Sequence, residues 1–405
     1  MIKFQKISID KYINYIFILY AFLVPISRAG IGITTAVLLI LWFFTDNFKD
    51  KIVYLKSNKV VQFLTLFIMF AFVSLLWTDD AGSGINYIAR FWYLLPILVI
   101  ATAVQKEYIP SAISAFLAGM FISEILSYGL FFELWTLNHG SPSDPTPFMN
   151  HLQYAMFLSF ASLLLLNKFF FEEKLRWKIF YFLYFLAVTS NLFLNGGRTG
   201  HFAFAVSIFV VGFLNIKNKF VAFFSMLILV TSIFYAAYEI SPVFKQRFDT
   251  SVKETQSISN DGVFCGSFGA RLGLWIVGSE IFLDNPILGI GISKNVETMK
   301  LYVKNSHPDM KCITHLPNYH NYYVQIAVKL GTIGLFLYLM IFYSILKLKI
   351  KDKKQYNLMI IFVSVYATSS LFENMFHQQF SEALFALFVG IFIAKSRERK
   401  KDKRI

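Results

Sequence analysis

About twelve long apolar stretches, separated by short polar breaks, dominate this sequence of 405 residues. A helix needs about 20 mostly apolar residues to span a bilayer, because it rises about 1.5 Å per residue through a hydrocarbon layer about 30 Å thick. We therefore predict an all-α integral membrane protein. The predicted spans lie near residues 11–27, 30–44, 60–77, 87–104, 110–133, 151–167, 178–194, 199–214, 220–239, 328–347, 357–373 and 379–395.

The composition excludes the main alternatives to a membrane protein. Hydrophobic residues make up 56% of the chain and charged residues 15%, whereas a soluble surface needs about a quarter of its residues charged. A chain with this apolar content also cannot remain disordered in water. The net charge of +14 would suggest nucleic acid in a soluble protein, but in a membrane protein it more often reports basic residues held on one side. We expect membrane lipids and no nucleic acid as partners.

Basic residues concentrate in alternate connections between the predicted spans. Since such connections lie in the cytoplasm, we expect both termini there too. The predicted order is 1–239 with nine spans, an outer loop 240–317, 318–395 with three spans, and a basic cytoplasmic tail 396–405. The basic residues on this side include Lys3, Lys6, Lys11, Lys49, Lys51, Lys56, Lys59, Lys106, Lys168, Lys174, Arg176, Lys178, Lys217, Lys219, Lys347, Lys349, Lys351, Lys353 and Lys354.

The outer face is predicted to carry connections near 78–86, 134–150 and 195–199 and the long polar segment 240–317. This segment is too long for a bare connection, so we expect a small helical cap. Both cysteines, Cys265 and Cys312, lie in it. They form either a disulfide or two buried free thiols, and an oxidising compartment favours the disulfide.

Five charged or titratable residues at the outer ends of apolar spans or in the cap are functional candidates: Arg28, Arg90, Arg198, Arg271 and His320. A charge at the centre of a span disfavours insertion by about 2.5–3.5 kcal/mol. Arg198 follows two glycines in Asn195-Gly196-Gly197-Arg198-Thr199-Gly200, a turn that opens a helix and suits a phosphate. The alternative is an arginine that snorkels to lipid headgroups.

Arg271 and His320 each have a structural alternative. Arg271 precedes an apolar stretch with Trp275, which is also typical of an interfacial anchor. His320 lies before the next span and suits a base or a phosphate ligand, although a histidine among tyrosines is more often a packing residue. The spacing of His307, Cys312, His315 and His320 matches no regular zinc motif, so we expect no metal and no cofactor.

Together these elements resemble the O-antigen ligase and polymerase superfamily of bacterial envelope enzymes. The resemblance spans nearly the whole chain and rests on Leu76-Trp77-Thr78-Asp79 with Arg90, Pro147-Phe148-Met149-Asn150, the Arg198 turn, Arg271-Leu272-Gly273-Leu274-Trp275, and His320-Asn321-Tyr322-Tyr323 with Gly331 and Gly334. It implies about twelve helices, a long periplasmic loop, metal-independent chemistry, and Arg198, Arg271 and His320 as the functional set. Gly197 stands where the family more usually has serine.

The function implied is transfer of O-antigen polysaccharide from undecaprenyl diphosphate to the lipid A-core, at the periplasmic face of the bacterial inner membrane. We expect Arg198 and Arg271 to bind the diphosphate and His320 to activate the acceptor hydroxyl or to donate to the phosphate. Direct attack would invert the anomeric centre. Arg28 and Arg90 are further candidates for the diphosphate or the acceptor headgroup, and Asp79 or Asp80 is a weaker candidate for the base.

Three other functions fit the same pattern. The scaffold also resembles O-antigen polymerases, our second choice, and protein O-oligosaccharyltransferases. A transporter or flippase of glycans or lipids is the alternative of another class. It is disfavoured because the unusual charges gather at one face rather than at mid-membrane.

Overall fold

The computed structural model describes residues 9–293 and 296–397, and within these ranges the chain forms helices and no strand. Lys3, Lys6 and most of the predicted basic tail lie outside the described residues. The α-helices are α1 (Ile9–Leu23), α2 (Arg28–Phe43), α3 (Phe48–Ser57), α4 (Lys59–Val73), α5 (Ala81–Ala89), α6 (Pro96–Ala103), α7 (Ile109–Phe131), α8 (His151–Phe171), α9 (Leu175–Leu194), α10 (Arg198–Asn215), α11 (Lys219–Ile240), α12 (Pro242–Asp261), α13 (Ser267–Asp284), α14 (Val296–Ser306), α15 (Tyr322–Leu346), α16 (Lys353–Ser369) and α17 (Gln379–Ser396). Short 3-10 helices are η1 (Ser74–Leu76), η2 (Arg90–Leu94), η3 (Lys106–Tyr108), η4 (Pro308–His315) and η5 (Met375–His377).

The prediction of an all-α integral membrane protein is confirmed. Nine helices within the described ranges are long and apolar enough to cross a membrane, or ten if the bent pair α2 and α3 counts as one span. All twelve predicted spans have a helical counterpart. Nine rather than twelve helices count as long enough to span, because α1, α2 and α16 contain only 15, 16 and 17 residues.

Two predicted boundaries were wrong. The connection expected at 78–86 is helical from Ala81, because the Asp80 side chain accepts a hydrogen bond from the Ser83 N–H and caps α5. The span expected to begin near 328 begins at Tyr322, with Asn321 as its cap. Gly331 kinks this helix with φ of 62°, and a Cβ there would lie 2.2 Å from the Ile287 carbonyl oxygen, so only glycine fits.

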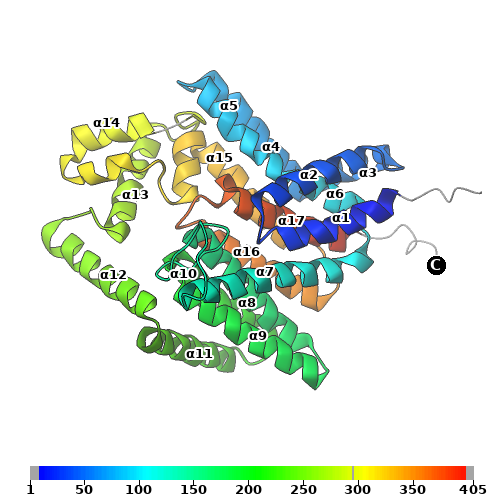
Figure 1. Cartoon of the computed structure of the whole chain (residues 1–405). Helices are drawn as coiled ribbons and strands as arrows, with labels where there is room; N and C mark the ends of the chain where they lie inside the picture. The colour runs from blue at the N-terminus through cyan, green and yellow to red at the C-terminus, as the bar shows by residue number, and fades with distance from the viewer. Residues whose placement is uncertain (1–8, 294–295, 398–405) are drawn as a thin grey trace, which may run out of the picture.

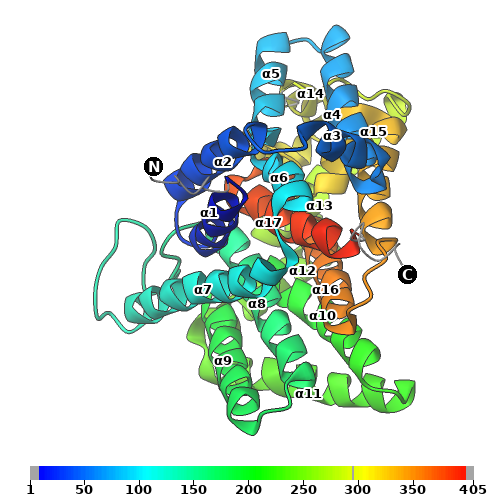
Figure 2. The same ribbon diagram turned by 90° about the vertical axis from the view of Figure 1, so that its right-hand side faces the viewer.

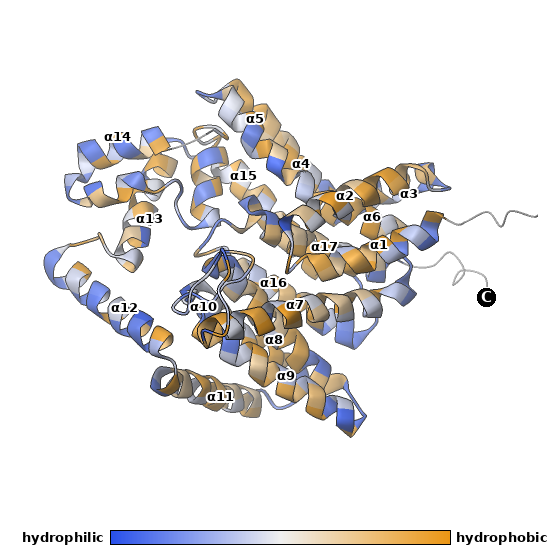
Figure 3. Ribbon diagram, viewed as in Figure 1, coloured by the Kyte–Doolittle hydropathy of each residue, from blue (hydrophilic) through white to orange (hydrophobic). Residues whose placement is uncertain are grey.

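The helices pack around one large apolar core that includes most of α8 and α17. On one side, α8 packs against α9, α10 and α16; on the other, α17 packs against α6 and α2. Figures 1 and 2 show α17 between α8 and its partners on one side and α2 and α6 on the other. Helix α15 contacts α17 and also packs against α4. Helix α11 is apolar along its length but little buried within the protein, which suits contact with lipid (Figure 3).

A second, smaller apolar cluster joins α13, α14 and η4 to the start of α15. Polar α12 links this cluster to α11 and extends along the outside of the molecule (Figure 1). A disulfide between Cys265 and Cys312, with Cα atoms 5.5 Å apart, ties the start of α13 to η4. In Figure 1, α13 and α14 lie on the side opposite the start of α1.

Candidate functional site

The turn that carries Arg198 is too tightly packed for any residue but glycine at position 197. It lies between α9 and α10, and the Asn195 Oδ1 accepts a hydrogen bond of 2.7 Å from the Gly197 N–H. A Cβ on Gly197 would lie 2.5 Å from the His151 carbonyl oxygen and 2.6 Å from the Ala155 Cβ. Without movement of α8, a serine cannot occupy position 197, so the turn presents backbone and Arg198 rather than a hydroxyl.

Arg198 joins three helices through its guanidinium. Its Nη1 donates to the Ser251 hydroxyl of α12, and its Nη2 donates to the Ser267 hydroxyl of α13 at 2.8 Å. The Glu254 carboxylate of α12 accepts hydrogen bonds from the N–H groups of Ser267 and Phe268 and thereby caps α13. The N-termini of α10 and α13 therefore meet at Arg198, and helix N-termini favour anions.

Arg271 and Arg247 add positive charge beside Arg198. Both guanidinium groups lie close enough to Arg198 to interact with it electrostatically, and so does the Glu254 carboxylate. The pKa of the Arg271 guanidinium is lowered by burial, and the Glu373 and Glu254 carboxylates oppose this effect. Arginine stays charged at neutral pH. The cluster therefore holds three positive guanidinium groups near the two carboxylates of Glu254 and Glu373. Such a cluster can hold a diphosphate with bidentate hydrogen bonds.

His320 adopts a backbone conformation that is unusual for a residue with a side chain. Its φ is 46°, in the left-handed region. The Asn318 Oδ1 accepts from the His320 N–H at 2.8 Å, and the Trp275 Nε1 donates to the Tyr319 carbonyl oxygen at 3.1 Å. Strained backbone persists where surrounding contacts hold it. Here these two hydrogen bonds hold the backbone so that the imidazole lies against Glu373, in the connection between α16 and α17.

The imidazole of His320 faces the carboxylate of Glu373. The Nδ1–Oε2 distance is 3.1 Å, and the side chain of Glu373 is only 3% exposed. Burial alone would raise the pKa of Glu373. The hydrogen bond and charge of His320, the Asn374 N–H and Arg271 outweigh burial, so its pKa is lowered. An ionised carboxylate can only accept, so the imidazole donates its Nδ1–H to Glu373, which leaves Nε2 as the nitrogen available to another group.

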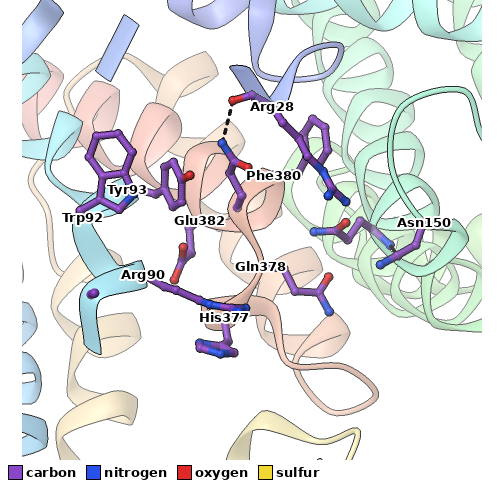
Figure 4. A pocket seen from close by; sticks show the side chains of 12 residues that line it. Arg28, Arg90, Trp92, Tyr93, Asn150, His377, Gln378, Phe380 and Glu382 are labelled. Atoms are coloured by element: carbon purple, nitrogen blue, oxygen red, sulfur yellow. Dashed lines mark hydrogen bonds between the residues drawn. The ribbon is translucent and has the colours of Figure 1, made fainter. Parts of the chain in front are cut away.

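Arg28 and Arg90 lie apart from the Arg198 cavity. Both line a cavity of about 590 Å³ with His377, Gln378 and Glu382, among others (Figure 4). A cavity of about 200 Å³ beside Arg198 is lined instead by Arg247 and largely apolar side chains of α10, α11 and α12, including Phe202, Phe234, Phe244 and Phe248. The five candidates thus fall into two groups rather than one.

The remaining sequence candidates have other contacts. Asp80 caps α5 and lines a further cavity with Arg90, while Asp79 is exposed. The Nε2 of His307 lies 2.8 Å from Glu280, and Cys312 is in the disulfide. Among the described residues, no group of three His, Cys, Asp or Glu side chains is placed to hold a metal ion.

Glu373, Glu254 and Arg247 were missed from the sequence. Glu373 lies at the end of a predicted span, 53 residues after His320, and Glu254 and Arg247 belong to a polar helix with many charges. A carboxylate at the outer end of a span was the only signal that could have indicated Glu373.

Part of this chain is similar to a known protein family. Residues 180–339 match the family model described as O-antigen ligase. The matched stretch includes Arg198, Arg271 and His320, whereas Arg28, Arg90 and Glu373 lie outside it. The chain is also 23% identical over 320 residues to an uncharacterized protein of Haemophilus influenzae, with 76% of this chain and 77% of the relative covered.

Proposed function

We propose that this chain is a member of the O-antigen ligase and polymerase superfamily, as the match over residues 180–339 supports. We further propose that it is a membrane glycosyltransferase that moves O-antigen polysaccharide from undecaprenyl diphosphate to the lipid A-core. The observation that carries this proposal is the convergence of Arg198, Arg247 and Arg271 next to the His320–Glu373 pair. The first group suits a diphosphate leaving group, and the second suits the activation of a hydroxyl.

The arginine cluster is the proposed donor site. Arg198 and Arg271 bind the diphosphate through guanidinium N–H groups, with the N-termini of α10 and α13 beside them. The apolar cavity beside Arg198 suits the first part of a polyprenyl chain, because its phenylalanine lining continues onto the lipid-facing helix α11. The donor headgroup and lipid thus have adjoining sites of matching chemistry.

The proposed reaction is a single displacement. The acceptor hydroxyl forms a bond to the anomeric carbon and passes its proton to Nε2 of His320. The bond between that carbon and the diphosphate oxygen breaks, and undecaprenyl diphosphate leaves with the electron pair and its charge held by the arginines. Glu373 positions the imidazole and stabilises it once protonated. Attack from the face opposite the leaving group inverts the anomeric centre.

The proposed location is the inner membrane, with the α12–α14 segment in the periplasm and both termini in the cytoplasm. The cysteine pair supports this location, because disulfides persist in oxidising compartments. The excess of lysine in the connections on the other side supports it as well. In this arrangement residues 240–317 form a cap over the donor site.

A transfer assay with the purified full chain tests the function. Lipid-linked O-antigen and lipid A-core are supplied as substrates, and we expect polysaccharide attached to lipid A-core as the product. Arg198→Ala, Arg271→Ala and His320→Ala should each reduce turnover about 100-fold or more, whereas Lys300→Ala, an exposed cation paired with Glu297, should not. Lengthened lipid-linked glycan would indicate a polymerase instead, and near-native turnover in all three variants would contradict the site.

A further inference from the structure

The cavity that contains Arg28 and Arg90 has the lining of a sugar-binding site. It lies where α2, η2, the start of α8 and the start of α17 meet. Figure 4 shows Arg28 and Asn150 on one side of the opening and Arg90, His377 and Glu382 on the other. A neighbouring cavity of about 600 Å³ shares Arg90 and His377 with it. The two spaces together have room for more than one sugar ring.

Three kinds of side chain in the lining of this cavity suit a sugar ligand. Arg28 and Arg90 supply positive charge, which binds phosphate or carboxylate groups. Asn150, Gln153 and Gln378 supply amide donors and acceptors for hydroxyls. Trp92 and Tyr93 also line the cavity and are partly exposed, and their rings offer flat apolar faces for the C–H face of a pyranose. This combination fits a sugar that carries negative charge.

Buried polar atoms in the lining lack partners within the protein. Glu382 is 0% exposed, and among the described residues neither of its carboxylate oxygens has a hydrogen-bond partner. The Gln378 Oε1 and the His377 Nδ1 are also buried and unpartnered in that part of the chain. Buried polar atoms are nearly always hydrogen-bonded. A ligand with several hydroxyls would donate to these acceptors.

A short hydrogen-bonded path connects this cavity with His320. The Glu373 Oε1 accepts a hydrogen bond of 3.1 Å from the Gln378 Nε2, which lines the cavity, while the Glu373 Oε2 faces the His320 Nδ1. The carboxylate of Glu373 therefore lies between the base and the cavity. On the other side of Glu373 lies Arg271 of α13, which interacts with it electrostatically. The donor cluster and this cavity therefore lie on either side of the His320–Glu373 pair.

We propose that this cavity binds the acceptor of the transfer, and that the acceptor is an anionic oligosaccharide with phosphate or carboxylate groups on its sugars. The inference rests on the proposed function for the role of acceptor. The binding of an anionic sugar rests on the cavity alone. Arg28 and Arg90 hold the negative groups, Glu382 and Gln378 bind hydroxyls, and the bound sugar presents one hydroxyl towards His320.

Binding of defined oligosaccharides to the detergent-solubilised full chain tests this inference without requiring turnover. The probes are the phosphorylated core oligosaccharide released from rough lipopolysaccharide, the same material after dephosphorylation, the same material after carboxyl reduction, and inorganic phosphate. We expect the intact probe to bind, and the loss of phosphate or of carboxylate to weaken binding about tenfold or more, which identifies the group that is recognised. Arg90→Gln and Arg28→Gln should each weaken binding to the same extent. An unchanged melting temperature of each variant shows that it is folded.

Arg198→Gln is the matched comparison, because it removes an arginine from the donor cluster, and it should leave oligosaccharide binding unchanged. Equal binding of the intact and both neutralised probes would overturn the inference. So would equal binding of inorganic phosphate, or a loss in Arg198→Gln as large as that in Arg90→Gln. A chain that binds the probe but transfers no glycan contradicts the proposed function and leaves this site standing. A chain that transfers glycan with binding unaffected in the Arg28 and Arg90 variants contradicts this inference only.

Discussion

Nδ1 of His320 lies 3.1 Å from Oε2 of Glu373, although 53 positions separate the two residues in the chain. Three features place them together: the left-handed backbone at His320, the hydrogen bond of 2.8 Å from the Tyr322 N–H to the Ser370 carbonyl oxygen, and the burial of Glu373. The pair links the arginine cluster under the cap to the cavity of Arg28 and Arg90. In the proposed reaction, this pair lies between the donor site and the acceptor site.

Glu373→Gln should reduce kcat about 10- to 100-fold with little change in the KM of the lipid-linked donor. An amide can accept from Nδ1 but cannot stabilise the imidazolium that forms as His320 takes the proton. The measurement is steady-state transfer by the purified variant. Glu280→Gln is the matched control, since Glu280 pairs with His307 in the cap at a similar distance, and its kcat should stay near the native value. Equal losses in the two variants would mean that Glu373 acts only through folding.

Arg271→Lys should not restore the activity that Arg271→Ala loses. A lysine keeps the charge but cannot make the two parallel hydrogen bonds of a guanidinium to a phosphate. We expect a loss of about tenfold or more in kcat/KM for the lipid-linked donor in the lysine variant. Full rescue by lysine would indicate that the position supplies only positive charge.

Gly197→Ser should destabilise the protein by about 1–3 kcal/mol or require a local shift of α8, because the added Cβ overlaps the His151 carbonyl oxygen. The melting temperature of the solubilised protein measures this effect. Gly32→Ala is the control: the nearest atoms to its added Cβ are ring carbons of Trp92 at 3.9 Å. A Gly197→Ser variant with native melting temperature would show that the turn accommodates a serine without strain.

Acid should weaken the fold through His377. The pKa of His377 is lowered to about 3 because its ring is buried and lies near Arg90 and Lys329, whereas an unfolded histidine has a pKa of about 6.5. The unfolded state therefore binds more protons between these values, so stability is lost as pH falls from about 6.5 towards 3. Melting temperatures between pH 7 and pH 4 should fall more steeply for the native protein than for His377→Asn. Parallel curves would exclude this contribution.

The disulfide provides a test of the cap. Loop-closure entropy for a sequence separation of 47 corresponds to about 4 kcal/mol of stabilisation in the chain-entropy account. Cys312→Ser should abolish the mobility difference between reduced and oxidised samples on a gel and lower the melting temperature. No mobility difference in the native protein would mean that the two thiols are free in the cell.

Fold class was predictable because a bilayer demands long apolar helices, and their periodic recurrence is visible without any tertiary information. Arg198, Arg271 and His320 could be singled out because each stands at an unusual place for its charge. Glu373 was not singled out, because its contact with His320 depends on the packing of α15 against the end of α16, and its place at the outer end of a predicted span was the only local signal. The separation of Arg28 and Arg90 from Arg198 and Arg271 was also not predicted, because it depends on which helix ends meet in space.

The position of a bound polyprenyl diphosphate would decide which arginines form the donor site. A structure of the full chain with undecaprenyl diphosphate should show phosphate oxygens within hydrogen-bond distance of the guanidinium groups of Arg198 and Arg271, with the lipid chain entering the apolar cavity beside Phe202 and Phe244. Diphosphate held instead by Arg28 and Arg90 would contradict the assignment of the donor site and, with it, the separate roles of the two arginine groups.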